Sequence, residues 1–147
     1  MKDECKGFKM RAEKILVILL RLCAGVLLLA IAPVFFPHGW MAAINRAAGL
    51  GELPHTAIVG YLTRSLSALY AFHGVIVLCL SWDVRRYLPL ILWFSAVAMA
   101  FGIFMLALDI SLGMPRPWII GEGPLIIGIY AVIFGLAVCV QRQISWH

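Results

Sequence analysis

Four charged side chains interrupt or border the long apolar runs of this sequence: Arg21, Arg64, Asp109 and Glu122. Arg21 lies near enough to the inner boundary for its guanidinium to reach the headgroups. A charge in hydrocarbon costs at least about 2.5 kcal/mol, so each group needs a partner, a water-filled cavity or a route to the bilayer surface. Asp109 ends a helical stripe of small residues that includes Gly102. Because a guanidinium can bind two carboxylates, we predict that Arg64 meets Asp109 or Glu122.

A second interpretation treats the same groups as a binding site. Tyr61 shares a helical face with Arg64, and Trp118 precedes Glu122 in one connector. On this interpretation the cluster lines an outward-opening cavity that accepts an anionic or polar headgroup, with Trp118 covering it. The candidate set is completed by His38 and His55. Both interpretations stay open at this stage: an ion pair that links two helices, and a cluster of residues that binds a ligand.

His73 belongs to a different environment. It lies nine residues after Arg64, a spacing that places it on the opposite face of a helix. Haem ligation by paired histidines would need a second histidine at similar depth, but the others fall at or beyond the predicted membrane boundaries. No H-x-x-x-H spacing supports zinc. No metal site is predicted.

No catalytic motif accompanies these residues. The serines lack a G-x-S-x-G elbow, and no glycine-rich loop could cradle a phosphate. The four cysteines form no C-x-x-C pair. An enzymatic activity is therefore not predicted, although membrane enzymes can place their reactive groups on separate helices.

The elements that position these residues are predicted to be four transmembrane helices in one all-α bundle. The 147-residue chain is 63% hydrophobic and 13% charged, with a mean hydropathy of +0.98. It has too little polar surface for a soluble globule of this size, and its length fits one membrane domain. The predicted spans cover residues 15–36, 57–82, 87–108 and 119–140, after a basic head at residues 1–14.

The connectors carry their own signals. Trp40, Met41 and Ile44 recur at helical spacing, which predicts a short interfacial helix between the first two spans. The connector DISLGMPRPWIIGEGP contains three prolines, which forbid a continuous helix and predict a kinked segment. In the fourth span a stripe of small residues predicts close packing, within the chain or against another chain: Gly128, Ala131 and Gly135.

The distribution of Lys and Arg predicts the orientation. Eight of the 12 flank one side of the predicted membrane: five in the head, two between spans two and three, and Arg142 in the tail. Arg46 and Arg116 flank the other side. The positive-inside bias places both termini in the cytoplasm, and the predicted location is the cell inner membrane. Since topology explains the charge of +5, no nucleic-acid partner is predicted.

Three motifs follow one another along the first two spans. They are an Arg-Leu opening (RLCAGVLLL), a proline-ended exit (APVFFP) and an R-x-x-x-x-x-Y-x-x-x-G pattern formed by Arg64, Tyr70 and Gly74. This order resembles the DoxX-like group of small bacterial four-helix membrane proteins, over roughly residues 21–140. The resemblance implies a single four-helix bundle, and some relatives accompany quinone-linked oxidoreductases. It carries over no catalytic residue, and the connector MPRPWIIGEGP departs from the group's pattern.

Two hypotheses for function follow. The first is a non-enzymatic membrane subunit or accessory protein that packs in the lipid bilayer against other membrane proteins or further copies of itself. The second is a protein that binds an amphiphile, either a quinone or a lipid, in an outward-facing polar pocket, as part of an oxidoreductase or alone. Apart from that quinone or lipid, no cofactor is predicted.

Overall fold

The computed structural model describes residues 2–144, and the side chains of residues 11–142. This part of the chain is helical and contains no strand, so the predicted all-α class is confirmed. Four helices are long and apolar enough to cross a membrane: α1 (Lys2–Leu29), α3 (Ala57–Leu80), α4 (Leu88–Ser111) and α6 (Gly123–Ile144). The shorter elements are η1 (Ala32–Phe35), α2 (His38–Ala47) and α5 (Arg116–Gly121).

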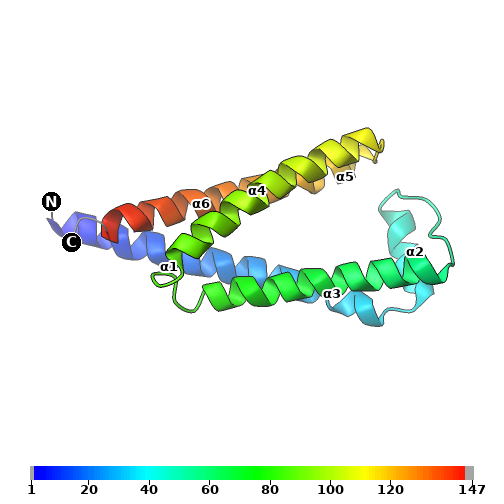
Figure 1. The fold of residues 1–147 in the computed structure, drawn as a ribbon, viewed down its shortest axis with the longest axis horizontal. Coiled ribbons are helices and arrows are strands. Elements are labelled where there is room, and N and C mark those ends of the chain that lie inside the picture. The colour runs from blue at the N-terminus through cyan, green and yellow to red at the C-terminus, as the bar shows by residue number, and fades with distance from the viewer. Residues whose placement is uncertain (1, 145–147) are drawn as a thin grey trace.

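The long helices are arranged as two pairs. In the first helix pair α1 packs along α3, in the second helix pair α4 packs along α6, and α1 joins the pairs by contacting α6. The start of α1 and the end of α6 lie at the same end of the molecule (Figure 1). From there the pairs diverge toward the opposite end, which we call the distal end and which carries α2 and α5.

The buried core occupies the half of the molecule nearer the termini. In α1 every fourth residue is buried, from Ala12 through Leu16 and Leu20 to Ala24, which is the stripe expected of a helix packed on one side. The other helices and the α3–α4 connector complete this core with Val77, Leu80, Val84, Leu88, Ile91, Tyr130, Ile133, Ala137 and Val140. The distal half therefore lacks a comparable core between the pairs.

Glycines set how closely the helices of each pair approach. In the first pair, a Cβ built on Gly74 would lie 3.0 Å from the Cβ of Leu27. In the second pair, a Cβ on Gly102 would lie 2.8 Å from Ile127, and one on Gly123 would lie 2.7 Å from Leu106. In a membrane, where water does not drive helices together, such close backbone contact is a main source of association.

The small-residue stripe of α6 takes no part in this packing. Gly128, Ala131 and Gly135 are exposed, and a Cβ on either glycine would meet nothing within 4 Å. Of the two alternatives predicted for this stripe, packing within the chain is therefore wrong. The glycines that pack α4 on α6 are those at the distal end of the contact.

The connectors follow the predicted breaks. α2 forms between the first two spans. α4 ends at Ser111, and Gly113 follows with a φ of +65° that favours glycine, while the Met114 N–H donates to the Asp109 carbonyl at 3.0 Å. The helix stops again at Glu122, between α5 and α6, because Pro124 has no N–H to continue the hydrogen-bond ladder. The predicted kink is confirmed, and it places Glu122 at the start of α6.

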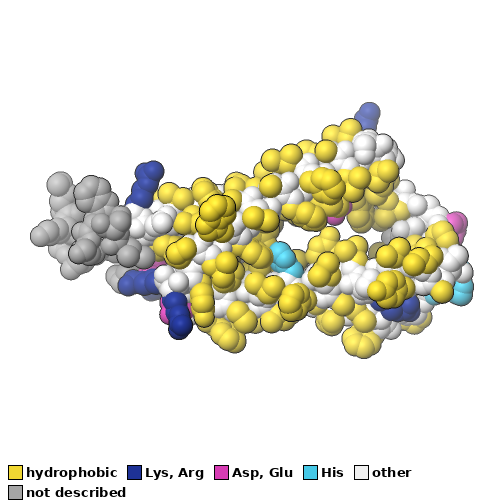
Figure 2. All heavy atoms as spheres, viewed as in Figure 1, with side chains coloured by type: hydrophobic (Ala, Val, Ile, Leu, Met, Phe, Trp, Pro, Cys, Tyr) yellow, Lys and Arg dark blue, Asp and Glu magenta, His cyan; other side chains and the backbone are white. Residues whose placement is uncertain are grey.

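The surface is suited to a bilayer. Figure 2 shows hydrophobic side chains over most of the visible face of the long helices, with Lys and Arg toward the two ends. The same view shows an open gap between the two helix pairs in the distal half, bordered by hydrophobic side chains. In a membrane this gap is filled by hydrocarbon, because empty apolar space forfeits the dispersion contacts of its lining.

Candidate functional site

Arg64 is held by backbone carbonyl groups. Its Nε donates to the Val34 carbonyl at 3.1 Å, its Nη2 to Phe36 at 3.2 Å, and its Nη1 to Gly60 at 3.2 Å. Val34 and Phe36 end the first span, where helical carbonyls have no partner further along the chain. A cation is favoured at such a carbonyl-rich end. Arg64 thus fastens η1 to α3.

The predicted pairing of Arg64 with Asp109 or Glu122 is wrong. Among the residues whose side chains are described, neither carboxylate lies within ion-pairing distance of this guanidinium. The reason is tertiary: the two helix pairs diverge at this depth, and Arg64 lies on the face of α3 turned toward η1. The ion pairs in this part of the chain join Arg46 to Glu52 at 3.4 Å and Arg85 to Glu13 at 2.8 Å.

Part of the predicted ligand cluster does come together around Arg64. A pocket of about 650 Å³, which we call the Arg64 pocket, is lined by Arg64 with Tyr61, His38 and His55. The two histidine rings meet edge to face, with centroids 4.2 Å apart. The Arg64 pocket therefore collects the predicted residues of α2, α3 and the connector between them, without Trp118 or Glu122.

Trp118 and Glu122 line a different pocket, of about 430 Å³, which we call the Glu122 pocket. Its walls come from both helix pairs: Tyr70 belongs to α3, while Trp118, Glu122 and Ile126 belong to α5, α6 and the break between them. The sequence offered Tyr70 only as part of the motif shared with the DoxX-like group. Its place in a pocket depends on how the two pairs face each other.

Glu122 lines this pocket, and a second carboxylate, Asp109, lies nearby at the distal end of α4. Asp109 is only 4% exposed, and its Oδ2 is buried without a hydrogen-bond partner. Leu106, one turn before Asp109, packs against Gly123, the residue after Glu122, so the two acids lie at the same level of the second helix pair. The start of α6 contributes a favourable partial positive charge, since the first N–H groups of a helix have no carbonyl partner. Asp109 and Glu122 therefore form an acidic pair between α4 and the break before α6.

A polar contact lies just below the Glu122 pocket, toward the termini. The His73 Nε2 and the Tyr130 hydroxyl are 3.0 Å apart, and the Phe94 ring packs against both side chains, with centroids 5.0 Å and 6.1 Å away. His73 is one helical turn from Tyr70, and Tyr130 one turn from Ile126. The helix pairs therefore meet at the level where the pocket ends. As predicted, His73 and Arg64 occupy separate environments.

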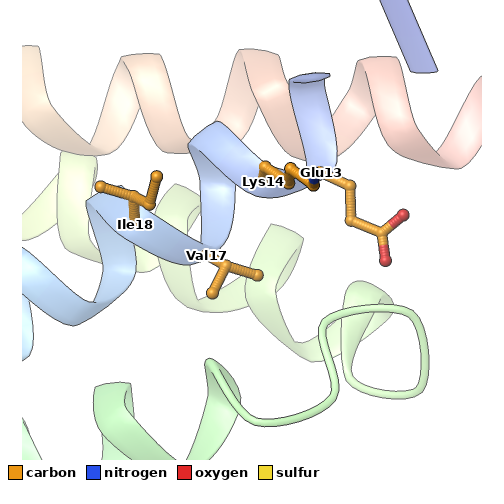
Figure 3. A pocket seen from close by; sticks show the side chains of 4 residues that line it. All are labelled: Glu13, Lys14, Val17 and Ile18. Carbon is orange, nitrogen blue, oxygen red and sulfur yellow. The ribbon is translucent and has the colours of Figure 1, made fainter. Parts of the chain in front are cut away.

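A third hollow, near the termini, is of another kind. Figure 3 shows Glu13, Lys14, Val17 and Ile18, all from α1, lining a space of about 350 Å³. The Glu13 carboxylate binds Arg85 in the α3–α4 connector, and this hydrogen-bonded ion pair raises the pKa of the Arg85 guanidinium above its ordinary value. Since one helix supplies every lining residue, this hollow is a surface feature beside a structural ion pair.

No group of three His, Cys, Asp or Glu side chains that could hold a metal ion occurs in the part of the chain that the structure describes. Comparison with known proteins adds no assignment. No protein-family model, no curated protein and no solved structure matches this chain significantly. The resemblance to the DoxX-like group therefore stays a prediction, and function has to be argued from the site.

Proposed function

We propose that this chain is an integral membrane protein that binds an amphiphile of the bilayer, a quinone or a lipid, in the Glu122 pocket. The observation that carries the proposal is the position of this pocket between the diverging helix pairs. Tyr70 lines it from one pair, and Glu122, with Trp118, from the other. The polar head would lie against these groups, and the apolar tail in the gap.

The proportions of the pocket support this function. Its volume of about 430 Å³ lies within the usual range for small-molecule sites, which combine an apolar lining with a few polar groups. Leu125 and Ile126 supply the apolar wall, and the hydrogen-bonded His73 and Tyr130 lie one turn below. Polar groups at membrane depth that face a cavity commonly mark a binding site.

Two substitutions test this proposal, one in the lining of the pocket and one outside it. Gly121 lines the Glu122 pocket, and a Cβ there would meet nothing within 4 Å, so we expect the side chain of Gly121→Phe to be accommodated and to compete for the space of the pocket. Gly128→Phe is the matched control, since it also enters open space but lies outside the lining of the pocket.

The measurement is organic extraction of protein purified in nanodiscs, followed by mass spectrometry. We expect one amphiphile enriched over bulk lipid in the wild-type protein and in Gly128→Phe, and lost in Gly121→Phe. Lipid present in all three samples only in proportion to the surrounding membrane would refute the proposal.

A second candidate function, a subunit that associates with other membrane proteins or with further copies of this chain, has separate support. The exposed stripe of Gly128, Ala131 and Gly135 presents a flat surface to the bilayer, and such stripes allow another helix to approach closely. Native mass spectrometry tests it. We expect Gly128→Phe to weaken association and Gly121→Phe to leave it unchanged. Binding of the amphiphile should show the opposite pattern, with loss in Gly121→Phe only.

The finer assignments belong to the same proposal. We propose that the protein resides in the cytoplasmic membrane, with the distal end facing outward, on the basis of the Lys and Arg distribution. Membership of the DoxX-like group, with an accessory role beside an oxidoreductase, is supported by the motif of Arg64, Tyr70 and Gly74. Cysteine-accessibility labelling of single-cysteine variants at residues 52 and 83 would test the orientation.

A further inference from the structure

The charges around the Glu122 pocket are unbalanced. Glu122 lines the pocket, and Asp109 lies nearby on α4, since Leu106, one turn before Asp109, packs against Gly123, the residue after Glu122. The Asp109 Oδ2 is buried and has no hydrogen-bond partner, so its desolvation is not offset by any described group of the protein. A buried carboxylate without a partner is costly, and it is stabilised when a proton or a cation reaches it.

The described part of the chain supplies no cation at this position. Arg64 lies on another face of α3, where it binds carbonyl groups. Arg116, at the start of α5, is exposed and pairs with neither carboxylate. His73 faces Tyr130 one turn below the pocket. A cationic ligand in this pocket would therefore meet no competing positive side chain among the described residues.

The other lining groups also suit a cation. Tyr70 and Trp118 place two aromatic rings in the lining of the same pocket as Glu122. The face of an aromatic ring attracts a cation, by about 0.5 kcal/mol when exposed and about 2 kcal/mol when desolvated. A carboxylate and two aromatic rings around an otherwise apolar cavity favour an ammonium group attached to a hydrophobic body. They disfavour a phosphate or a carboxylate.

We infer that the Glu122 pocket selects a hydrophobic cation, in which an amine or quaternary ammonium head is attached to an apolar tail. This inference rests on the proposed function and narrows it to an amphiphile with a cationic head, which excludes a neutral quinone. It differs from the expectation drawn from the sequence, in which a cavity lined by Arg64 would accept an anionic or polar headgroup, because Arg64 lies in a different pocket. The ammonium lies in the pocket that Glu122, Tyr70 and Trp118 line.

The test compares two single-chain amphiphiles of equal tail and opposite charge, decyltrimethylammonium and decyl sulfate, below their micellar concentrations. Binding is measured by calorimetry to the protein in phosphatidylglycerol nanodiscs, and binding to empty nanodiscs is subtracted. We expect saturable binding of the ammonium compound alone. Glu122→Gln should weaken it about tenfold or more, because a charge-assisted contact is lost. Trp118→Leu should weaken it about threefold to tenfold through the loss of the cation–π contact.

Glu52→Gln is the matched control. It removes the same charge from an exposed acid that pairs with Arg46, away from the pocket, so its binding should equal that of the wild type. Repeating the titration in nanodiscs that contain phosphatidylethanolamine separates two sources of the cation. Weaker binding there than in nanodiscs with the same fraction of an uncharged lipid shows that the ammonium of a lipid headgroup competes for the pocket, and equal binding shows that this headgroup does not occupy it.

Two outcomes would overturn the inference: equal saturable binding of both amphiphiles, or ammonium binding that Glu122→Gln leaves unchanged. If the ammonium compound fails to bind while extraction still finds an enriched amphiphile that Gly121→Phe removes, the proposed function holds and only the charge of the head is wrong. If both experiments are negative, both proposals fail.

Discussion

The two helix pairs are built alike but end differently. Each is held together by a close glycine contact, at Gly74 in the first pair and at Gly102 and Gly123 in the second. Each also carries charge at its distal end. In the first pair Arg64 donates hydrogen bonds to three carbonyls, whereas in the second pair a buried oxygen of Asp109 has no partner.

This difference separates two uses of charge at membrane depth. A cation can be satisfied by the free carbonyls at the end of a helix, so Arg64 stabilises the fold without any other molecule. A carboxylate needs donors, and none of the described groups donates a hydrogen bond to the buried Oδ2 of Asp109. We therefore expect substitution of Arg64 in the first pair to lower the stability of the fold. Substitution of the acids in the second pair should instead weaken ligand binding.

The largest effect is expected at the close glycine contacts, a feature that both helix pairs share. Gly123→Leu should destabilise the protein by about 3 kcal/mol, because the added side chain enters space that Leu106 and the Gly102 backbone already fill. Gly74→Leu should have a similar effect in the first pair. Unfolding in mixed micelles measures both. Gly128→Leu is the control, and an equal loss there would contradict the assignment of these contacts.

The second-largest effect on stability should distinguish the first helix pair from the second. Arg64→Leu leaves the carbonyls of Val34 and Phe36 without a donor and should cost about 2 kcal/mol. Glu122→Gln should change stability by less than about 0.5 kcal/mol while it weakens binding. The same unfolding assay gives both values. If Glu122→Gln proved as destabilising as Arg64→Leu, the acidic pair would be part of the scaffold.

A smaller effect is expected where the pairs meet. His73→Phe and Tyr130→Phe each remove the hydrogen bond between these side chains and should cost about 1 kcal/mol. The double variant should cost less than the sum of the two, since both changes remove one interaction. Additive losses in this cycle would show that His73 and Tyr130 act independently.

The smallest effect is expected at the ion pair near the termini. Arg85→Ala removes the contact with Glu13, which is exposed to solvent and screened by salt. The pair raises the pKa of Arg85, so its contribution is present below the ordinary arginine value and is lost only at higher pH. The effect of Arg85→Ala should therefore not vary between neutral and moderately alkaline pH, and a dependence on pH in that range would contradict this assignment.

Much of the fold could be predicted because it depends on local sequence. The apolar runs gave four helices, the prolines of the connector gave the break at Glu122, and the spacing around Met41 gave α2. The stripe ending at Asp109 was also a local property, and Ser95, Gly102 and Asp109 are indeed buried on one face of α4. Helical periodicity fixes which residues share a face.

The partners of those faces could not be predicted in the same way. Arg64 and Asp109 have complementary charges and similar depth, which favoured a pair, but charge alone does not say which helices are neighbours. The glycine stripe of α6 was equally ambiguous between an internal and an external contact. Tyr70 gave no sign that it would share a pocket with Glu122, because the two residues are far apart in the chain.

The sequence by itself determined a membrane protein of four apolar helices, the breaks between them, and the residues that share each helical face. Hydrophobic length and the chemistry of proline and glycine act within a few residues, so they can be read along the chain. Only the tertiary structure decided that the helices form two diverging pairs. In a membrane many helix faces are equally hydrophobic. Which helices pack together therefore depends on close backbone contacts such as those of Gly74, Gly102 and Gly123.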